Sequence, residues 1–121
     1  MKKEMFDNNP LLRTTFSFSL LIIQYCEKLE EQKKYVIARQ LLKSGTAIGA
    51  NAMEAQHGES KADFVHKIKI AAKEAEETQY WLWLCKESPG YPDCGELIGK
   101  VAEINRLLTR ILSTARSKIN K

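Results

Sequence analysis

Four long segments of this chain carry apolar residues at steps of three and four, and this spacing restricts the fold more than any other feature. Steps of that size place side chains on one face of an α-helix. In the first segment, the face consists of Leu12, Phe16, Ser19, Ile22 or Ile23, Cys26 and Leu29. The spacing predicts helices at about residues 10–31, 34–57, 61–87 and 95–117.

Two of the expected helix starts carry residues that commonly cap helices. Asn8 or Asn9 can cap the first helix, and Pro10 suits its first turn. Ser60 can cap the third helix, with Asp63 as its capping-box partner. These residues support the boundaries that the apolar spacing predicts.

Short breaker sequences separate the segments. Gly58 is a plausible stop for the second helix, and the strongest breaker cluster is E-S-P-G-Y-P-D-C-G-E at residues 87–96. A chain of 121 residues with 44% hydrophobic residues can bury a core of its own. We therefore expect one all-α domain over residues 1–121, an antiparallel up-down-up-down four-helix bundle.

The cysteines and the apolar runs indicate a compartment. Cys26, Cys85 and Cys94 are widely spaced, odd in number and form no C-x-x-C pair, which favours reduced thiols in a cytosolic protein. The apolar run at residues 20–23 is too short to span a bilayer. We expect a cytoplasmic protein without a membrane partner.

The second segment contains the stretch S-G-T-A-I-G-A-N-A-M-E-A, which is rich in small residues. Each mid-helix glycine costs about 1 kcal/mol relative to alanine. Gly45 and Gly49 share one face, so another helix can approach that face closely. Tight helix packing is one interpretation, and a groove for a ligand or a nucleic-acid backbone is the other. Ser44, Asn51 and Glu54 are expected as polar members of the same helix or subunit interface.

The third segment carries two apolar stripes instead of one. The first contains Phe64, Ile68, Ala71 or Ala72, Ala75, Gln79 and Leu82, and the second contains Ile70, Glu74, Glu77, Trp81 and Leu84. Two stripes fit either a central helix with several neighbours or a subunit interface. We expect Glu74, Glu77, Tyr80 and Trp81 at such an interface, although exposed aromatics can also stack on bases.

Two acidic-x-x-His spacings raise the alternative of a carboxylate-bridged metal site. Glu54 precedes His57 and Asp63 precedes His66, and Glu27, Glu74 and Glu77 are conceivable further ligands. Both motifs flank a single turn near one end of the predicted bundle, so we expect no metal and no cofactor. The sequence also has no nucleophile triad and no phosphate-binding glycine loop, so we expect no catalytic residue and no enzyme activity.

Basic residues concentrate at the end of the chain, which has a net charge of +4. Residues 104–121 contain five basic residues and no acidic one, and Arg106 and Arg110 share a helix face. The predicted nucleic-acid-binding residues are Arg106, Arg110, Arg116 and Lys118, with Lys69 and Lys73 from the third helix. Alternatively, the cations only complement the helix dipole. In an oligomer, repeated copies of the patch would add up their phosphate contacts.

Residues 40–84 resemble the core of the 23S rRNA intervening-sequence proteins, a family also labelled S23 ribosomal proteins. The first matching motif consists of Gln40, Lys43, Ser44, Ile48, Gly49, Ala50, Asn51, Glu54 and Ala55. The second consists of Asp63, Phe64, Lys67, Ile70, Ala71, Lys73, Glu74, Ala75, Glu77, Thr78, Tyr80, Trp81 and Leu82. Lys43 stands where arginine is commoner, which removes a planar two-pronged contact.

The resemblance implies a bacterial, cytoplasmic four-helix bundle that assembles as a ring-like homopentamer. A related branch of the family serves as the accessory protein of diversity-generating retroelements, which implies nucleic-acid binding.

Together, these features predict a non-enzymatic homo-oligomer that binds structured RNA, or an RNA–DNA hybrid, through backbone phosphates. The alternative is a protein–protein scaffold ring that does not bind nucleic acid directly. A carboxylate metalloenzyme is a more distant alternative.

Overall fold

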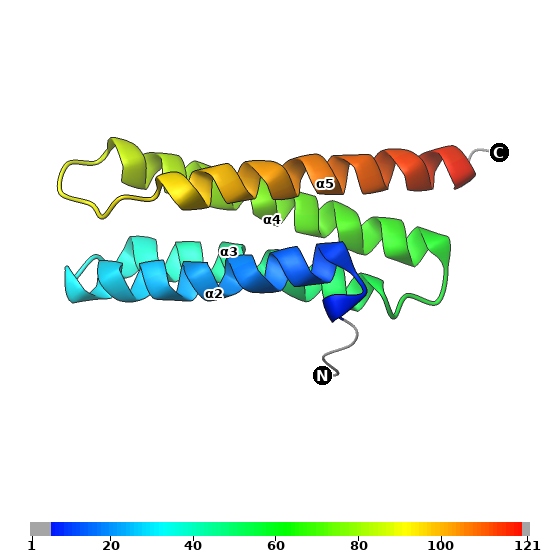
Figure 1. The fold of residues 1–121 in the computed structure, drawn as a ribbon, viewed down its shortest axis with the longest axis horizontal. Coiled ribbons are helices and arrows are strands. Elements are labelled where there is room, and N and C mark those ends of the chain that lie inside the picture. Colours follow the sequence, from blue (N-terminus) through cyan, green and yellow to red (C-terminus); the bar gives the residue numbers. More distant parts are fainter. Residues whose placement is uncertain (1–5, 120–121) are drawn as a thin grey trace.

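The computed structural model describes the backbone of residues 6–119 and the side chains of residues 6–117. This part of the chain forms four long α-helices and no strand, which confirms the all-α prediction. The helices are α2 (Pro10–Glu31), α3 (Tyr35–Ala55), α4 (Lys61–Glu87) and α5 (Gly95–Ile119) (Figure 1). Among these helices, none is long and apolar enough to cross a membrane.

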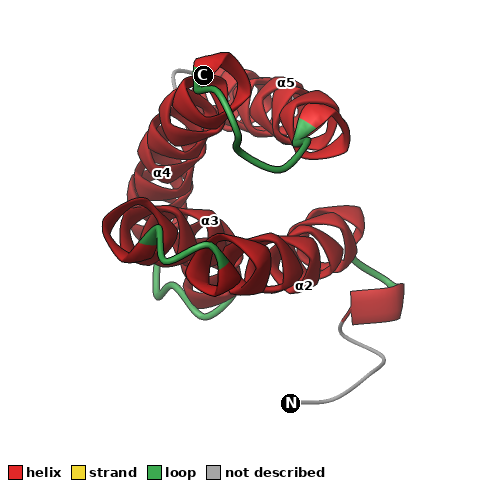
Figure 2. Cartoon of the chain, turned by 90° about the vertical axis from the view of Figure 1, so that its left-hand side faces the viewer, coloured by secondary structure: helices red, strands yellow, loops and turns green. Residues whose placement is uncertain are grey.

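The helices lie side by side in the order of the sequence. In Figure 1, the chain runs from right to left along α2, back along α3, and then in the same alternating way along α4 and α5. The end-on view in Figure 2 shows the four helices curving round, with α2 and α5 on either side of the opening. α2 packs extensively on α3 but contacts α5 much less, and α5 runs on past the start of α2 (Figure 1).

All four helices contribute to one hydrophobic core. Its largest fully buried side chains include Phe18 and Ile22 from α2, Leu41 and Ile48 from α3, Ile68 and Leu82 from α4, and Ile104 and Leu108 from α5. The first apolar stripe of α4 therefore faces the core through Ile68, Ala75 and Leu82. Apolar side chains at helical steps thus account for the packing of the bundle.

The helix ends show which of the expected caps are used. The Asn9 side chain accepts hydrogen bonds from the backbone N–H groups of Leu11 and Leu12, at 3.1 and 3.3 Å. The Ser60 hydroxyl accepts one from the N–H of Asp63, at 3.1 Å. Each cap satisfies N–H groups that have no partner inside the helix.

α3 is shorter than the expected range of 34–57. Its last residue is Ala55, because the backbone then tightens. The Gln56 and His57 N–H groups donate to the carbonyls of Met53 and Glu54, three residues back, at 3.1 and 3.0 Å. Such bonds tighten the last turn and end the α-helical geometry. Gly58 therefore lies in the connection, two residues beyond the C-cap Gln56.

One end of the bundle is held by a buried tyrosine and three buried cysteines. The Tyr25 hydroxyl of α2 donates to the carbonyl of Pro92 in the α4–α5 connection, at 2.8 Å. Cys26, Cys85 and Cys94 are all free and buried. The Cys26 and Cys94 thiols donate to the Ala38 and Leu82 carbonyls, at 3.4 and 3.3 Å. The Tyr25 and Cys94 contacts tie the α4–α5 connection to the core, whereas the Cys26 contact joins α2 to α3.

Candidate nucleic-acid and subunit interfaces

The glycines of the small-residue stretch lie against α2. A Cβ atom added to Gly45 would come within 2.9 Å of two side-chain carbons of Ile22, and one added to Gly49 would come within 3.3 Å of the Thr15 hydroxyl oxygen. Gly45 is buried and Gly49 is half-buried. The face that contains both glycines therefore gives α2 and α3 their close approach within one chain, as the tight-packing interpretation requires.

Ser44 links α3 to α4 inside the core. Its hydroxyl and that of Thr78 form a hydrogen bond of 2.9 Å, and the Thr78 hydroxyl also lies 2.7 Å from the Glu74 carbonyl oxygen, to which it donates. Both side chains are almost completely buried. Two buried hydroxyls that satisfy each other fix the register between the two helices.

Asn51 and Glu54 lie nearer the surface of the same helix pair. The half-buried Asn51 side chain donates to the carbonyl of Ala47 in its own helix, at 2.9 Å. Glu54 forms an ion pair of 3.4 Å with Lys67 of α4. The exposed fractions of the two side chains are 58% and 35%, so this pair contributes at most about 1 kcal/mol.

The two acidic-x-x-His motifs line one hollow at the α3–α4 connection. Glu54, His57, Asp63 and His66 all border it. Within the described part of the chain, no three His, Cys, Asp or Glu side chains gather closely enough to hold a metal ion. Glu27, Glu74 and Glu77, the conceivable further ligands, do not line this hollow.

The second stripe of α4 remains largely open in the single chain. Ile70, Glu74 and Trp81 are half-buried, whereas Glu77 and Leu84 are exposed. The Trp81 indole N–H donates to a Glu77 carboxylate oxygen at 3.3 Å, and the Tyr80 ring meets the Trp81 ring edge-on at 5.4 Å. α4 therefore carries both a core face and an uncovered face with large side chains.

The pKa of the Glu74 carboxyl in this stripe lies above its ordinary value. Partial burial raises the pKa of the Glu74 carboxyl, the neighbouring Glu77 carboxylate raises it further, and the Lys43 ammonium partly opposes both effects. Two carboxylates placed close together favour protonation of one of them. Lys43 of α3 thus acts on the acidic stripe of α4 through its charge.

The predicted nucleic-acid-binding cations are exposed on two neighbouring helices. Arg106, Arg110 and Arg116 lie on α5, and Lys69 and Lys73 on α4. The Lys118 side chain lies outside the described residues. Among the described side chains, Lys67 and Glu54 form the single ion pair, so these five cations are not neutralised by close carboxylates.

A side-chain hydrogen bond shows how α4 and α5 are aligned. The Asn105 amide N–H donates to the Gln79 amide oxygen at 3.3 Å. The two helices run in opposite directions (Figure 1), each with a rise of about 1.5 Å per residue. Arg116 follows Asn105 by 11 residues and Lys69 precedes Gln79 by 10, so Arg116 and Lys69 come level along the bundle.

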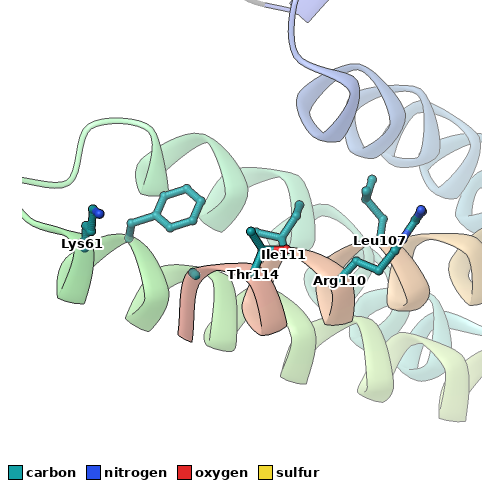
Figure 3. A pocket seen from close by; sticks show the side chains of 7 residues that line it. Lys61, Leu107, Arg110, Ile111 and Thr114 are labelled. Atoms are coloured by element: carbon teal, nitrogen blue, oxygen red, sulfur yellow. The ribbon is translucent and has the colours of Figure 1, made fainter. Parts of the chain in front are cut away.

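Arg110 belongs to a different surface, an apolar groove of about 430 Å³ that we call the α4–α5 groove. Its lining consists of Lys61, Phe64, Leu107, Arg110, Ile111, Thr114 and Ala115. In Figure 3, Lys61 and Arg110 lie at opposite ends of the row of side chains. Since Lys69 and Lys73 are not part of the lining, the structure does not bring all the predicted cations to one site.

Three contributors to these surfaces were not among the predicted site residues. The sequence could have identified Thr78 as a buried polar residue, because it places a hydroxyl within the series of Ala71, Ala75 and Leu82 on the core face of α4. Lys61 and Phe64 lie in the first turn of α4. They line the groove only because α5 reaches them from the opposite direction, which the local sequence does not encode.

Comparison with known proteins gives a matching family and similar solved structures. The sequence model of the family described as "23S rRNA-intervening sequence protein" matches residues 8–110. A 1.70 Å crystal structure of a protein of unknown function from the S23 ribosomal protein family of Bacteroides thetaiotaomicron VPI-5482 is also similar. It has 39% sequence identity and a TM-score of 0.80, and the match covers 84% of this chain and 97% of that one. No curated protein matches the chain significantly.

Proposed function

Because the chain belongs to the 23S rRNA-intervening sequence protein family, we propose that it is a non-enzymatic homo-oligomer that binds structured RNA, or an RNA–DNA hybrid, through backbone phosphates. Its up-down-up-down bundle would be the repeating unit of the ring-like pentamer that the family resemblance implies, and we expect it in the bacterial cytoplasm.

The observation that carries this proposal is the acid-free half of α5. Residues 104–121 contain no acidic residue, and Arg106, Arg110 and Arg116 are exposed there without a carboxylate partner among the described residues. Lys69 on α4 is level with Arg116 and is also exposed. Free cations repeated in every copy of an oligomer would release many counterions from a phosphate backbone, which favours binding without base readout.

Self-association is supported by apolar side chains that one chain leaves uncovered. Among residues 6–117, the large exposed apolar side chains are those of Phe16, Leu20, Ile23, Tyr35, Val36, Tyr80, Trp83 and Leu84. They lie on three helices, so no single small patch accounts for them. Exposed apolar surface of this extent is typical of proteins that bury it against a partner.

A protein–protein scaffold is the second candidate. It is favoured by the aromatic end of α4, where the exposed fraction of Tyr80 is 59% and that of Trp83 is 41%. Aromatic anchors of this kind commonly dominate protein interfaces. In that case the ring recruits another protein, and binding does not weaken steeply with salt.

The deciding experiment is charge reversal at Arg106 and Arg116, which lie outside the α4–α5 groove. The double variant Arg106→Glu, Arg116→Glu is compared with Lys28→Glu, Arg39→Glu. The control reverses two exposed cations on α2 and α3 and changes the net charge equally. Binding of a fluorescent RNA hairpin is followed by anisotropy over a salt series.

We expect the α5 variant to bind the hairpin more weakly, and its log–log salt slope to become shallower by an amount that corresponds to about two phosphate contacts. The control variant is expected to keep the affinity and the slope of the natural protein. Light scattering of each variant verifies that the assembly is unchanged. Equal losses in the two variants would contradict a site on α5, because only the net charge would then matter.

A further inference from the structure

The α4–α5 groove occupies a position that a helix would fill in a longer bundle. α5 continues past the start of α2 (Figure 1), and no residue of α2 or α3 lines the groove. Phe64, Leu107, Ile111 and Ala115 are therefore only half-buried, although the first three pack against the apolar core of the bundle. The groove therefore presents an apolar surface of the kind that packs against a helix, and no helix of the same chain covers it.

The same chain carries a helix face that matches this floor. Phe16, Leu20, Ile23 and Glu27 of α2 follow at steps of four, three and four, so they share one face, which we call the α2 strip. The exposed fractions of its three apolar residues are 44%, 46% and 40%, and Glu27 is also exposed. Three apolar anchors at this spacing are the usual contact set of a helix that lies in an apolar groove.

The charges of the two surfaces are complementary. The groove has Lys61 and Arg110 at its opposite ends and no acidic residue in its lining (Figure 3). The α2 strip ends in Glu27 and is followed by Glu30 and Glu31, which are both exposed. Because each end of the groove carries a cation, the acidic end of the α2 strip can pair with a cation whichever way its helix runs along the groove.

We propose that the α2 strip of one copy occupies the α4–α5 groove of the next copy. This inference rests on the proposed self-association and names the surfaces that produce it. The strip and the groove are on different helices, so a pair of copies still has one free strip and one free groove. Such head-to-tail contacts continue until a ring closes.

The test uses one variant that damages each surface. Leu20→Asp places a charge in the strip at an exposed position, and Ile111→Asp places a charge on the groove floor. Each variant alone is expected to have the monomer mass of 13.8 kDa by light scattering or native mass spectrometry. Mixed in equal amounts, they are expected to form dimers only, because one copy retains its groove and the other its strip.

Two further variants cover the case in which Ile111→Asp fails to fold. Thr114→Glu places an acidic residue in the groove at an exposed position, where it repels Glu27 and reduces the assembled fraction. The Glu27→Lys variant is expected to dissociate, and combining it with Arg110→Glu or Lys61→Glu restores the oligomer. The combination that restores it gives the direction of the helix in the groove. Arg39→Asp, at an exposed polar residue of α3 outside both surfaces, is the control that retains the wild-type mass.

The outcomes separate this inference from the proposed function. A wild-type protein that is monomeric would overturn self-association, and the proposed contact with it. Wild-type mass in both Leu20→Asp and Thr114→Glu would overturn the contact alone. If Thr114→Glu abolishes RNA binding without changing the mass, RNA occupies the groove instead of a second copy. Loss of RNA binding in the α5 variant with an unchanged mass leaves the contact unaffected.

Discussion

The Ser44 hydroxyl of α3 and the Thr78 hydroxyl of α4 form a hydrogen bond of 2.9 Å inside the core. It joins two of the sequence motifs through a pair of small polar residues that are almost inaccessible to solvent. Because both hydroxyls are buried, removing that of Thr78 leaves the Ser44 hydroxyl without its partner, which costs about 1–3 kcal/mol. Removing that of Ser44 costs less, because the Thr78 hydroxyl still donates to the Glu74 carbonyl.

We therefore expect Ser44→Ala and Thr78→Val each to lower the free energy of unfolding, and the double variant to lose less than the sum. The reason is that the second substitution removes a group that the first has already deprived of its partner. Chemical denaturation of the four proteins measures the coupling. Additive effects within about 0.5 kcal/mol would show that the bond contributes no pairwise stability.

Gly45→Ala is expected to destabilise the protein, although alanine favours helix by about 1 kcal/mol. The new Cβ would lie 2.9 Å from two carbons of Ile22, a fully buried side chain with little freedom to move. Overpacking of this kind costs about 1–3 kcal/mol.

Gly99→Ala is the matched control, because a Cβ there meets no atom within 4 Å and the helix gains stability. Gly49→Ala, with its nearest contact at 3.3 Å, should fall between the two. Thermal unfolding ranks the three variants. A Gly45→Ala protein as stable as Gly99→Ala would mean that α2 and α3 do not approach closely.

The pKa of Glu74 should respond to its two charged neighbours in opposite directions. Glu77→Gln removes a carboxylate and should lower the pKa, whereas Lys43→Met removes a cation and should raise it. Glu76→Gln is the control, since Glu76 is exposed and is not a cause of the shift. Carboxyl chemical shifts in an NMR titration report each value, and identical Glu74 curves in all variants would contradict this arrangement.

The buried Cys26 thiol should make the protein less stable in alkali. Burial, together with the Cys85 and Glu30 charges, raises the pKa of Cys26 from 9.0 to about 12. The folded state therefore holds this proton more tightly than the unfolded state. Its contribution to stability is complete below about pH 9 and is lost as the pH rises toward about 12.

Denaturant midpoints measured across this pH range should fall less steeply in Cys26→Ala than in the natural protein. Arg39→Ala, an exposed substitution on the neighbouring helix, is the control and should keep the natural slope. The same slope in Cys26→Ala would show that the thiol does not contribute to the alkaline loss.

The existence of the helices could be predicted from the sequence, because local rules determine it. Apolar steps, the Asn9 cap and the Ser60 cap all act within one turn of the residue concerned. The end of α3 could not be predicted in this way, since Gln56 and His57 continue a helical pattern but form bonds to residues three positions back.

Prediction of the candidate interfaces required tertiary geometry, unlike prediction of the helices. Sequence spacing put Arg106 and Arg110 on one face, but it could not show that Arg110 lines a groove with Lys61. That groove follows from how far α5 extends past α2. Similarly, the sequence alone does not show which lysine pairs with Glu54, and only the distance between α3 and α4 selects Lys67.

The proposed function requires that an oligomer of this chain binds structured RNA through several phosphates. The most direct measurement is the affinity of the natural protein for an RNA hairpin over a salt series, with the mass of the complex from light scattering. We expect an oligomeric complex and a log–log slope steeper than about −4, which corresponds to four or more neutralised phosphates. An oligomer that fails to bind the hairpin even at low salt would contradict the claim and favour the scaffold.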